Sequence, residues 1–171
     1  HPETVYVILS TGEESENLRA RVSSKGLEAS VRLVGEVPYE DLPKYYNACD
    51  VFVLANRELP DGDMEGFGIV FLEANACEKP VIAGDSGGTS DPVREGVNGF
   101  LVDASEPGNI ADAVIRVFDD PKRAAEMGRA GRAIVDEEYA WDKVVANVED
   151  LSRRVIAGES TNEKNRLIAQ P

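Results

Sequence analysis

Short runs of β-favouring apolar residues alternate with longer helical patterns, and this alternation limits the possible fold more than any other feature of the chain. Strands that alternate with helices pair in parallel through right-handed crossovers, and their helices cover both faces of the sheet. The sequence therefore predicts an α/β fold, a Rossmann-like parallel sheet of about five strands with flanking helices. The expected strands are Val5–Leu9, Val31–Val34, Val51–Ala55, Pro80–Ala83 and Gly99–Val102.

The helical patterns lie between these strands and then follow one another without interruption after the last strand. The run Val51–Ala55 (VFVLA) has no polar position, which is typical of a strand covered on both faces. Residues 1–157 are expected to form one domain, and the polar tail 158–171 is expected to be flexible. The expected helices are Glu13–Lys25, Tyr39–Asn47, about Gly68 to Cys77, Glu106–Phe118, Lys122–Glu138 and Trp141–Ala157.

Length and charge exclude several classes of protein. The 171 residues suffice to bury a core, and 18 basic against 32 acidic residues give a formal net charge of −14. This acidic balance argues against a nucleic-acid partner and against a polybasic membrane-surface protein. No apolar run approaches the roughly 18 residues that span a bilayer, so the cytoplasm is the expected location. Cys49 and Cys77 lie in apolar segments and are expected to be buried thiols rather than a disulfide.

Several motifs that suggest catalysis fail on closer inspection. Residues 84–88 spell G-D-S-G-G, the string around the nucleophile of trypsin-like proteases. A nucleophilic serine needs a base within hydrogen-bond reach, and the sole histidine is His1, so Ser86 is expected to be a loop residue near the ligand cleft. The dinucleotide fingerprint and the Walker A string are both absent. The strand ends also lack the acidic residues of a phosphoreceiver domain.

The most informative segment is Glu65–Ala74, EGFGIVFLEA, where a glycine-bearing loop becomes a helix. The free amides of a first helical turn and the positive end of the helix dipole attract an anion such as phosphate. Gly66 and Gly68 let the backbone approach a ligand without a Cβ in the way. Glu73, one turn into the helix, suits a diol rather than a phosphate, since like charges repel. A phosphate cradle with two carboxylates suggests a sugar nucleotide, although first-turn glutamates and loop glycines are also ordinary features.

This segment resembles the E-x7-E signature of retaining GT-B glycosyltransferases, specifically the C-terminal, donor-binding domain of family 4 ("glycosyl transferases group 1"). The resemblance covers roughly residues 2–157. It is carried by VRLVG at 31–35, LPKYYNACDVFVL at 42–54, EGFGIVFLEANACEKPVIA at 65–83, SGGTSDPVREGVNGFLV at 86–102 and Tyr139-Ala140-Trp141.

The resemblance implies roles for individual residues. Glu65 matches the glutamate that contacts the donor sugar near the reacting centre, and Glu73 matches the one that holds the ribose. The amides of Ile69 and Val70 would face the phosphate, although core packing is an equal alternative for Ile69 and Val37. The backbone that meets sugar hydroxyls would be Gly66, Phe67 and Gly68, and the backbone that meets the base would be Glu36 and Val37.

The implied activity is transfer of a sugar from a UDP- or GDP-sugar to a hydroxyl acceptor with retention of configuration. No cofactor and no metal are expected, since positive side chains and helix dipoles would stabilise the departing diphosphate. The alternatives are a nucleotide-sugar-binding or regulatory module without transferase activity, and a purely structural interaction domain. The expected partners are the nucleotide-sugar donor and an N-terminal acceptor-binding domain, with no nucleic acid.

The chain also departs from the family pattern. His1–Gly12 matches the second strand of the domain, so the first strand and helix, with the family's phosphate-binding Arg and Lys, are missing. The whole acceptor-binding domain is missing as well. The chain alone is therefore expected to be inactive, and membrane association, peripheral at the inner face, is expected only through the missing domain. Ser10–Glu13 stands where the family has a glycine-rich turn, Ser90-Asp91 stands where it commonly has Pro-Glu, and Ala140 replaces a better N-cap.

Overall fold

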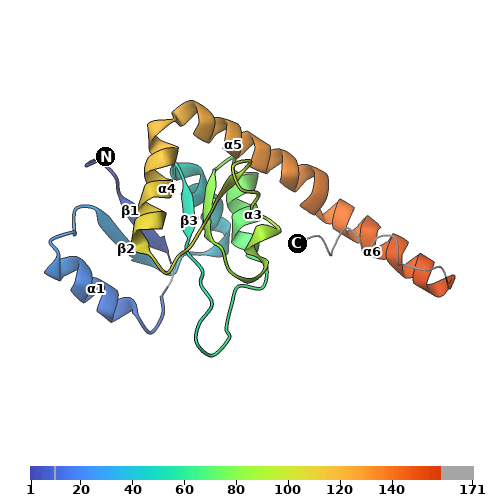
Figure 1. The fold of residues 1–171 in the computed structure, drawn as a ribbon, viewed down its shortest axis with the longest axis horizontal. Helices are drawn as coiled ribbons and strands as arrows, with labels where there is room; N and C mark the ends of the chain where they lie inside the picture. The colour runs from blue at the N-terminus through green and yellow to red at the C-terminus, as the bar shows by residue number, and fades with distance from the viewer. Residues whose placement is uncertain (10, 159–171) are drawn as a thin grey trace.

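A computed structural model describes residues 1–9 and 11–158 as an α/β arrangement of parallel strands and helices (Figure 1). The predicted α/β class is confirmed, and every predicted strand is present. The strands are β1 (Tyr6–Leu9), β2 (Val31–Gly35), β3 (Phe52–Leu54), β4 (Val81–Gly84) and β5 (Gly99–Val102). Apart from Gly158, the tail that was expected to be flexible lies outside the described residues.

The predicted helices are also present, with two differences in detail. The segment predicted as one helix at Tyr39–Asn47 begins as a 3-10 turn, η1, and the helix predicted to reach Glu138 changes into a π-helix, η3. The helices are α1 (Ser15–Ser24), η1 (Tyr39–Asp41), α2 (Leu42–Ala48), α3 (Ile69–Ala76), η2 (Gly87–Ser90), α4 (Pro107–Asp119), α5 (Pro121–Ile134), η3 (Val135–Tyr139) and α6 (Trp141–Ile156).

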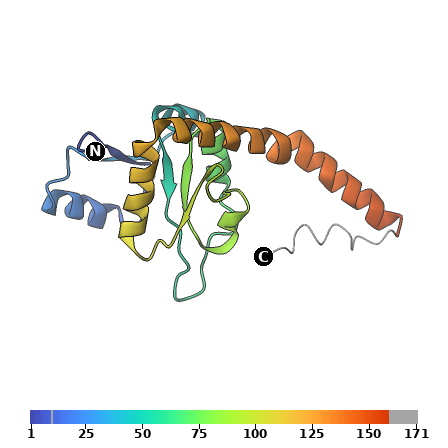
Figure 2. The same cartoon turned by 45° about the horizontal axis from the view of Figure 1, so that its top comes forward.

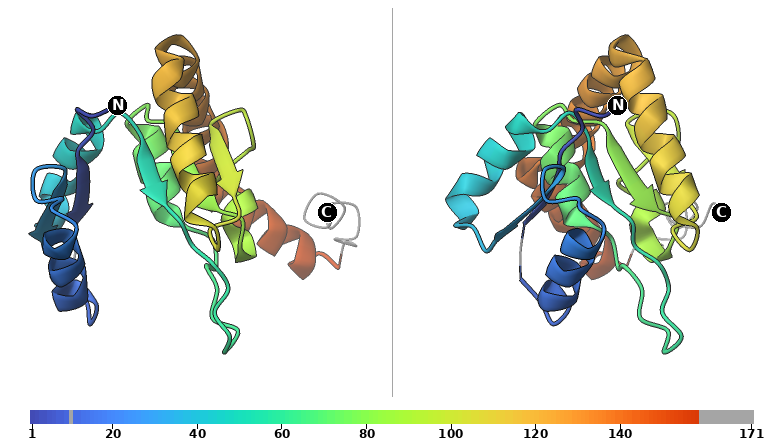
Figure 3. Two further views of the ribbon diagram at one scale, coloured as in Figure 1. Left: turned by 60° about the vertical axis from the view of Figure 1, so that its left-hand side comes forward. Right: turned by 90° about the vertical axis from the view of Figure 1, so that its left-hand side faces the viewer.

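The strands form two parallel sheets, which corrects the prediction of a single five-stranded sheet. β1 pairs with β2, and a second sheet has the order β3-β4-β5. In the described part of the chain, β1 and β3 each lack a partner on their second edge. Both views of Figure 3 show the dark-blue pair of strands standing apart from the teal and green strands. The alternating pattern identifies strands but does not identify which strands are neighbours. Two strands pair only when they lie about 4.8 Å apart, and this spacing is set by the tertiary structure.

The core is built around β4, whose four residues are all buried. Successive side chains of a strand point to opposite faces. Val81 and Ala83 accordingly pack with Phe71 of α3, while Ile82 packs with Phe100 and with side chains of α4 and α5. The three-stranded sheet thus has side chains packed on both faces, and Figure 2 shows the same layers from another side. The strand expected to be fully covered, β3, is only half-buried, and its Leu54 is exposed.

The β1–β2 sheet contributes little to this core. No described residue before Gly68 is buried, and the apolar Tyr6 and Val7 of β1 are about half exposed. Strand residues of this composition normally lie against another layer. The structure therefore leaves apolar surface on this sheet that the described residues do not cover.

The C-terminal helix α6 extends away from the rest of the molecule (Figure 1). Val145, Val148, Leu151 and Val155 are all exposed, although their spacing is that of a helix with one apolar face. No helix in the described part of the chain is long and apolar enough to cross a membrane. Cys49 and Cys77 are free, as predicted, but they are half-buried and not the buried thiols that the sequence led us to expect.

Candidate functional site

The candidate site centres on the turn that leads from the loop at residue 65 into α3. Gly68 caps this helix with a φ of +87°, in the left-handed region that favours glycine. A Cβ at Gly68 would lie 2.5 Å from a ring carbon of Phe71, so no other residue fits there without rearrangement. Phe71 is fully buried, and the turn is therefore fixed to the core of the molecule.

The first turn of α3 offers unpaired backbone donors. No side chain caps the helix at Gly68, and the amides of Ile69 and Val70 have no hydrogen-bond partner among the described residues. The positive end of the helix dipole adds to their attraction for an anion. Ile69 is 59% exposed, so its alternative role as a core residue is wrong, while Val70 is half-buried.

Glu65 lies in the loop before the helix, and its carboxylate is held by two donors. The side-chain amide of Asn56 donates to Oε2 at 2.8 Å, and the backbone N–H of Phe67 donates to Oε1 at a longer 3.4 Å. Glu65 is half-buried, and Gly66 beside it is exposed. The structure thus gives Glu65 a fixed orientation next to an accessible backbone.

Glu73 lies one turn further along α3 and is also half-buried. Its Oε2 accepts a hydrogen bond of 2.8 Å from the hydroxyl of Tyr46 in α2. Burial raises the pKa of Tyr46, and the hydrogen bond and negative charge of Glu73 raise it further. Tyr46 therefore stays a neutral donor at physiological pH and orients the carboxylate that was predicted to hold the ribose.

A second loop holds residues 65–68 from the side. The N–H of Gly88 in η2 donates to the carbonyl oxygen of Glu65 at 2.9 Å. A Cβ at Gly87 would lie 2.1 Å from the Glu65 oxygen, and a Cβ at Gly88 would lie 2.1 Å from the oxygen of Gly66. Only glycine allows this approach of two backbones, and the segment SGGTS therefore supports the loop that carries Glu65.

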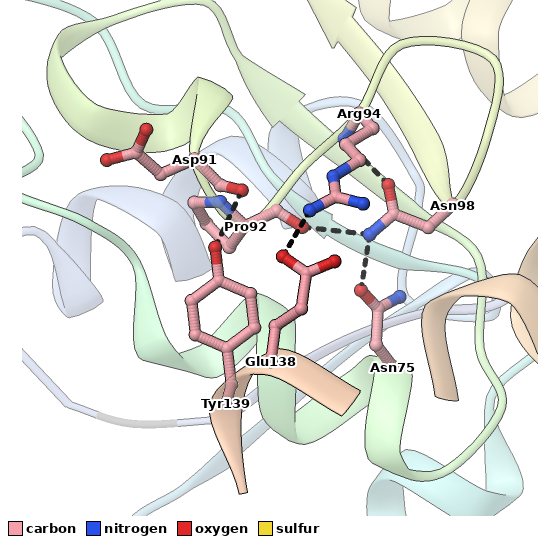
Figure 4. Close-up of polar contacts among 7 residues, drawn as sticks. All are labelled: Asn75, Asp91, Pro92, Arg94, Asn98, Glu138 and Tyr139. Atoms are coloured by element: carbon pink, nitrogen blue, oxygen red, sulfur yellow. Dashed lines mark hydrogen bonds and ion pairs between the residues drawn. The ribbon is translucent and has the colours of Figure 1, made fainter. Parts of the chain in front are cut away.

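The aromatic ring of Phe67 connects the same loop to η3. Its centroid lies 5.7 Å from that of Tyr139, a separation typical of aromatic pairs. Figure 4 shows how η3 is held: the Tyr139 hydroxyl donates to the carbonyl oxygen of Asp91, and Glu138 pairs with Arg94. The joint between α5 and α6 is therefore in contact with the loop of residues 65–68.

Buried amides connect the same region to α3. Asn98 Nδ2 donates to Asn75 Oδ1 at 2.7 Å and to the carbonyl oxygen of Pro92 at 2.8 Å, and Asn98 Oδ1 accepts from the N–H of Arg94 (Figure 4). Asn75 and Asn98 are both fully buried, and their polar atoms are satisfied by these bonds together with the one that Asn75 Nδ2 donates to the carbonyl oxygen of Lys79 at 2.9 Å. The helix that carries Glu73 is thus fixed to the β4–β5 connection.

Glu36 and Val37 follow β2, in the other sheet. Glu36 is exposed and accepts a hydrogen bond of 3.1 Å from the hydroxyl of Thr11, while Val37 is half-buried. No described hydrogen bond or ring contact joins either residue to the segment 65–73. Glu36 and Val37 follow the carboxyl end of β2, and the loop that carries Glu65 follows the carboxyl end of β3. Ligands bind at the carboxyl ends of strands in open α/β sheets.

Ser86 shares no described contact with His1, the only histidine of the chain. Ser86 is half-buried at the start of η2, whereas His1 Nε2 lies 3.0 Å from Asp119 Oδ1 and its ring packs on Phe118 at the end of α4. The expectation that the G-D-S-G-G string is not a protease motif is therefore supported by the geometry. Across residues 1–9 and 11–158, no three His, Cys, Asp or Glu side chains gather closely enough to hold a metal ion.

Sequence reasoning missed Asn56, Tyr46 and Tyr139 as contacts of the site. Asn56 directly follows a predicted strand, and the rule that ligands bind at carboxyl ends of strands could have identified it. Tyr46 and Tyr139 gave no such signal, because their contacts with Glu73 and Phe67 are made between separate elements of the fold.

Comparisons with known proteins identify relatives of the chain as a whole. The chain is 39% identical over 148 residues to a Mycobacterium tuberculosis protein named GDP-mannose-dependent alpha-(1-6)-phosphatidylinositol monomannoside mannosyltransferase, covering 86% of this chain and 38% of that protein. The chain thus spans well under half the length of this relative.

Two solved structures have the same fold. Sucrose-phosphate synthase from Thermosynechococcus elongatus superposes with a TM-score of 0.76 at 30% identity, over 92% of this chain and 39% of that one. HepE from Anabaena, in complex with UDP-glucose, gives a TM-score of 0.76 at 26% identity, over 92% of this chain and 42% of that one. Residues 1–134 match the family described as "Glycosyl transferases group 1", and together with the identity to the mannosyltransferase this shows that the chain belongs to that transferase family.

Proposed function

We propose that this chain is the donor-binding part of a retaining glycosyltransferase that moves a sugar from a nucleotide sugar to a hydroxyl acceptor. The observation that carries the proposal is the arrangement around α3. Glu65 is held beside an exposed glycine backbone, the amides of Ile69 and Val70 have no partner among the described residues, and Glu73 is oriented by Tyr46. A sugar, a diphosphate and a ribose would meet these three groups in that order.

The names of similar proteins support a nucleotide sugar as the ligand. The mycobacterial relative is named GDP-mannose-dependent, and the HepE structure contains UDP-glucose. The higher identity to the mannosyltransferase, 39% against 26%, makes GDP-mannose the first donor to test and UDP-glucose the second.

The groups of the site suit the charge changes of sugar transfer. As the bond to the sugar breaks, negative charge grows on the departing diphosphate, and the N-terminal amides and dipole of α3 stabilise it. Positive charge grows on the sugar, and the carboxylate of Glu65 stands on that side of the proposed ligand. In this proposal the chain needs no metal ion and no cofactor.

The interrupted sheet supports a domain with one more strand. The described residues form two separate parallel sheets, β1-β2 and β3-β4-β5. With one more strand between β1 and β3, they would give the doubly wound order 3-2-1-4-5-6. A parallel strand between β1 and β3 would pair both open edges and cover the exposed apolar side chains of β1. We propose that further polypeptide of the same protein supplies this strand and its helix. The same polypeptide would also supply the acceptor-binding domain. We propose that the whole protein acts in the cytoplasm, at the inner face of the membrane.

The proposed roles of the two glutamates are tested by Glu73→Gln and Glu65→Gln. Both changes keep the size of the side chain and remove its charge, and hydrogen bonds to a charged group contribute about 1.5–3 kcal/mol. Glu73→Gln should lower the affinities for GDP and for GDP-mannose alike, roughly 10- to 100-fold. Glu65→Gln should leave GDP nearly unchanged and weaken GDP-mannose. Calorimetric titration of both variants with both ligands measures this.

Glu28→Gln is the matched control, because Glu28 is exposed and precedes β2, at the opposite end of the strands from the site. It should change neither affinity. Equal losses for both ligands at both glutamates would contradict separate ribose and sugar roles. Unchanged binding in Glu73→Gln would leave Glu73 as a helix residue that serves only to pair with Tyr46.

A further inference from the structure

We propose that Asn56 is a positioning residue that sets the orientation of the Glu65 carboxylate toward the donor sugar; this rests on the proposed function of Glu65. The amide of Asn56 donates to Glu65 Oε2 at 2.8 Å, which is the shorter of the two hydrogen bonds to that carboxylate. The eight residues between them, 57–64, are all exposed. The exposed segment 57–64 does not hold Glu65, whose shorter side-chain hydrogen bond and backbone contact with Gly88 both come from other parts of the fold.

Asn56 is itself firmly placed on the three-stranded sheet. Its N–H donates to the carbonyl oxygen of Leu54 at 3.0 Å, directly after β3. Its backbone also lies against the end of β4, where a Cβ at Gly84 would fall 1.7 Å from the Asn56 carbonyl oxygen. Gly84 is buried, so Asn56 is supported by the core of the sheet. A donor held in this way can fix the carboxylate that accepts from it.

The chemistry of the asparagine side chain also suits this role. Its Oδ1 is buried and has no hydrogen-bond partner in the described residues. Turning the amide over would place an oxygen against the carboxylate of Glu65, so only the observed orientation is favourable. Buried amide oxygens without a partner are uncommon. The unpartnered oxygen of Asn56 is therefore a cost that accompanies the hydrogen bond from its nitrogen to Glu65.

Loss of the Asn56 amide donor should weaken binding of the sugar end of the ligand only. Without it Glu65 retains the longer hydrogen bond from Phe67 and is free to rotate away from the sugar. Glu73 and the first turn of α3 do not contact Asn56 in any described hydrogen bond, so the nucleotide end of the site should be unaffected. A residue that merely stabilised the fold would weaken both ends together.

The experiment measures GDP and GDP-mannose binding to the 171-residue chain carrying Asn56→Ala, Glu65→Gln or both. Asn56→Ala should lower the affinity for GDP-mannose roughly 10-fold and leave the affinity for GDP within about 2-fold of the unchanged chain. In the Glu65→Gln background it should have no further effect, because Asn56 acts through Glu65. Asn17→Ala is the matched control: Asn17 donates to Glu14 at 2.9 Å in an exposed pair at the start of α1. It should change neither affinity.

A readout that needs no ligand accompanies the titration. In the NMR spectrum of the chain, one side-chain amide proton of Asn56 should lie downfield, and Glu65→Ala should return it to the usual position. Asn56→Asp should weaken GDP-mannose at neutral pH more than Asn56→Ala does, because two carboxylates would then face each other.

Equal loss of GDP and GDP-mannose in Asn56→Ala, additive losses in the double variant, or no downfield proton would each overturn the role of Asn56 while leaving the proposed function intact. Failure of the unchanged chain to bind either ligand, with the downfield proton present, would instead contradict the proposed function and with it any role of Asn56 in sugar binding.

Discussion

At the scale of single residues, the site depends on glycines that stand where a side chain would collide with backbone. Gly88 packs on the carbonyl oxygen of Gly66, and Gly84 packs on that of Asn56. These contacts bring the loop of Glu65 against the carboxyl end of β4. The carboxylates of Glu65 and Glu73 accept hydrogen bonds from neutral donors, Asn56 for Glu65 and Tyr46 for Glu73.

The bond between Tyr46 and Glu73 should contribute to stability in a pH-dependent way. Tyr46→Phe should lower the free energy of unfolding by about 1 kcal/mol at pH 7, since the bond is only half-buried. The pKa of Tyr46 is raised in the folded protein, whereas an unfolded tyrosine titrates near pH 10. The stability that its neutral form provides is therefore complete below about pH 10 and lost as the pH rises further.

Urea unfolding of both proteins between pH 7 and 11 tests this expectation. The difference between wild type and Tyr46→Phe should be constant up to about pH 9 and then shrink. The pKa values of Tyr6 and Tyr139 are raised as well, so both proteins should lose some stability above pH 10. A difference that grows with pH would contradict the assigned role of the Tyr46 hydroxyl.

At the scale of elements, α3 and α6 differ in how their apolar residues are used. Phe71 of α3 is fully buried between the sheet and its neighbours, whereas Val148 of α6 is 58% exposed. The joint between α5 and α6, η3, is held by Tyr139 and Glu138, but beyond it α6 leaves the body of the molecule (Figure 1).

This difference predicts opposite results for two substitutions. Phe71→Ala should lower the free energy of unfolding by about 3–5 kcal/mol, because it empties a filled core position. Val148→Lys should change it by less than about 0.5 kcal/mol, because the site is solvent-exposed. Urea denaturation measures both. A large loss for Val148→Lys would show that the apolar face of α6 is packed in solution, and sedimentation of the chain would then reveal whether a second copy covers it.

At the scale of the whole molecule, the two separate sheets and the comparisons lead to the same expectation. The chain corresponds to 38% of the mannosyltransferase that it resembles, and in the described residues β1 and β3 belong to two sheets that are not paired with each other. We therefore expect the 171-residue chain by itself to transfer no sugar. The measurement is release of GDP from GDP-mannose, and of UDP from UDP-glucose, with hydroxyl acceptors present.

Turnover above the uncatalysed rate by the purified chain would contradict this expectation. Binding without turnover, both here and in a longer protein that contains this chain, would favour the alternative of a nucleotide-sugar-binding or regulatory module. Absence of any nucleotide binding would favour a structural interaction domain.

The sequence by itself determined the α/β class, each strand and most helix boundaries, because apolar periodicity and glycine positions act locally. It also determined that Glu65 and Glu73 flank a helix start at Gly68, since both follow from a single continuous segment. The order of the sheets, the exposure of Ile69 and the donors that orient the two carboxylates were decided only by the tertiary structure. Asn56, Tyr46 and Tyr139 reach the site from other elements, and the sequence pattern of one element carries no information about which side chains of another will contact it.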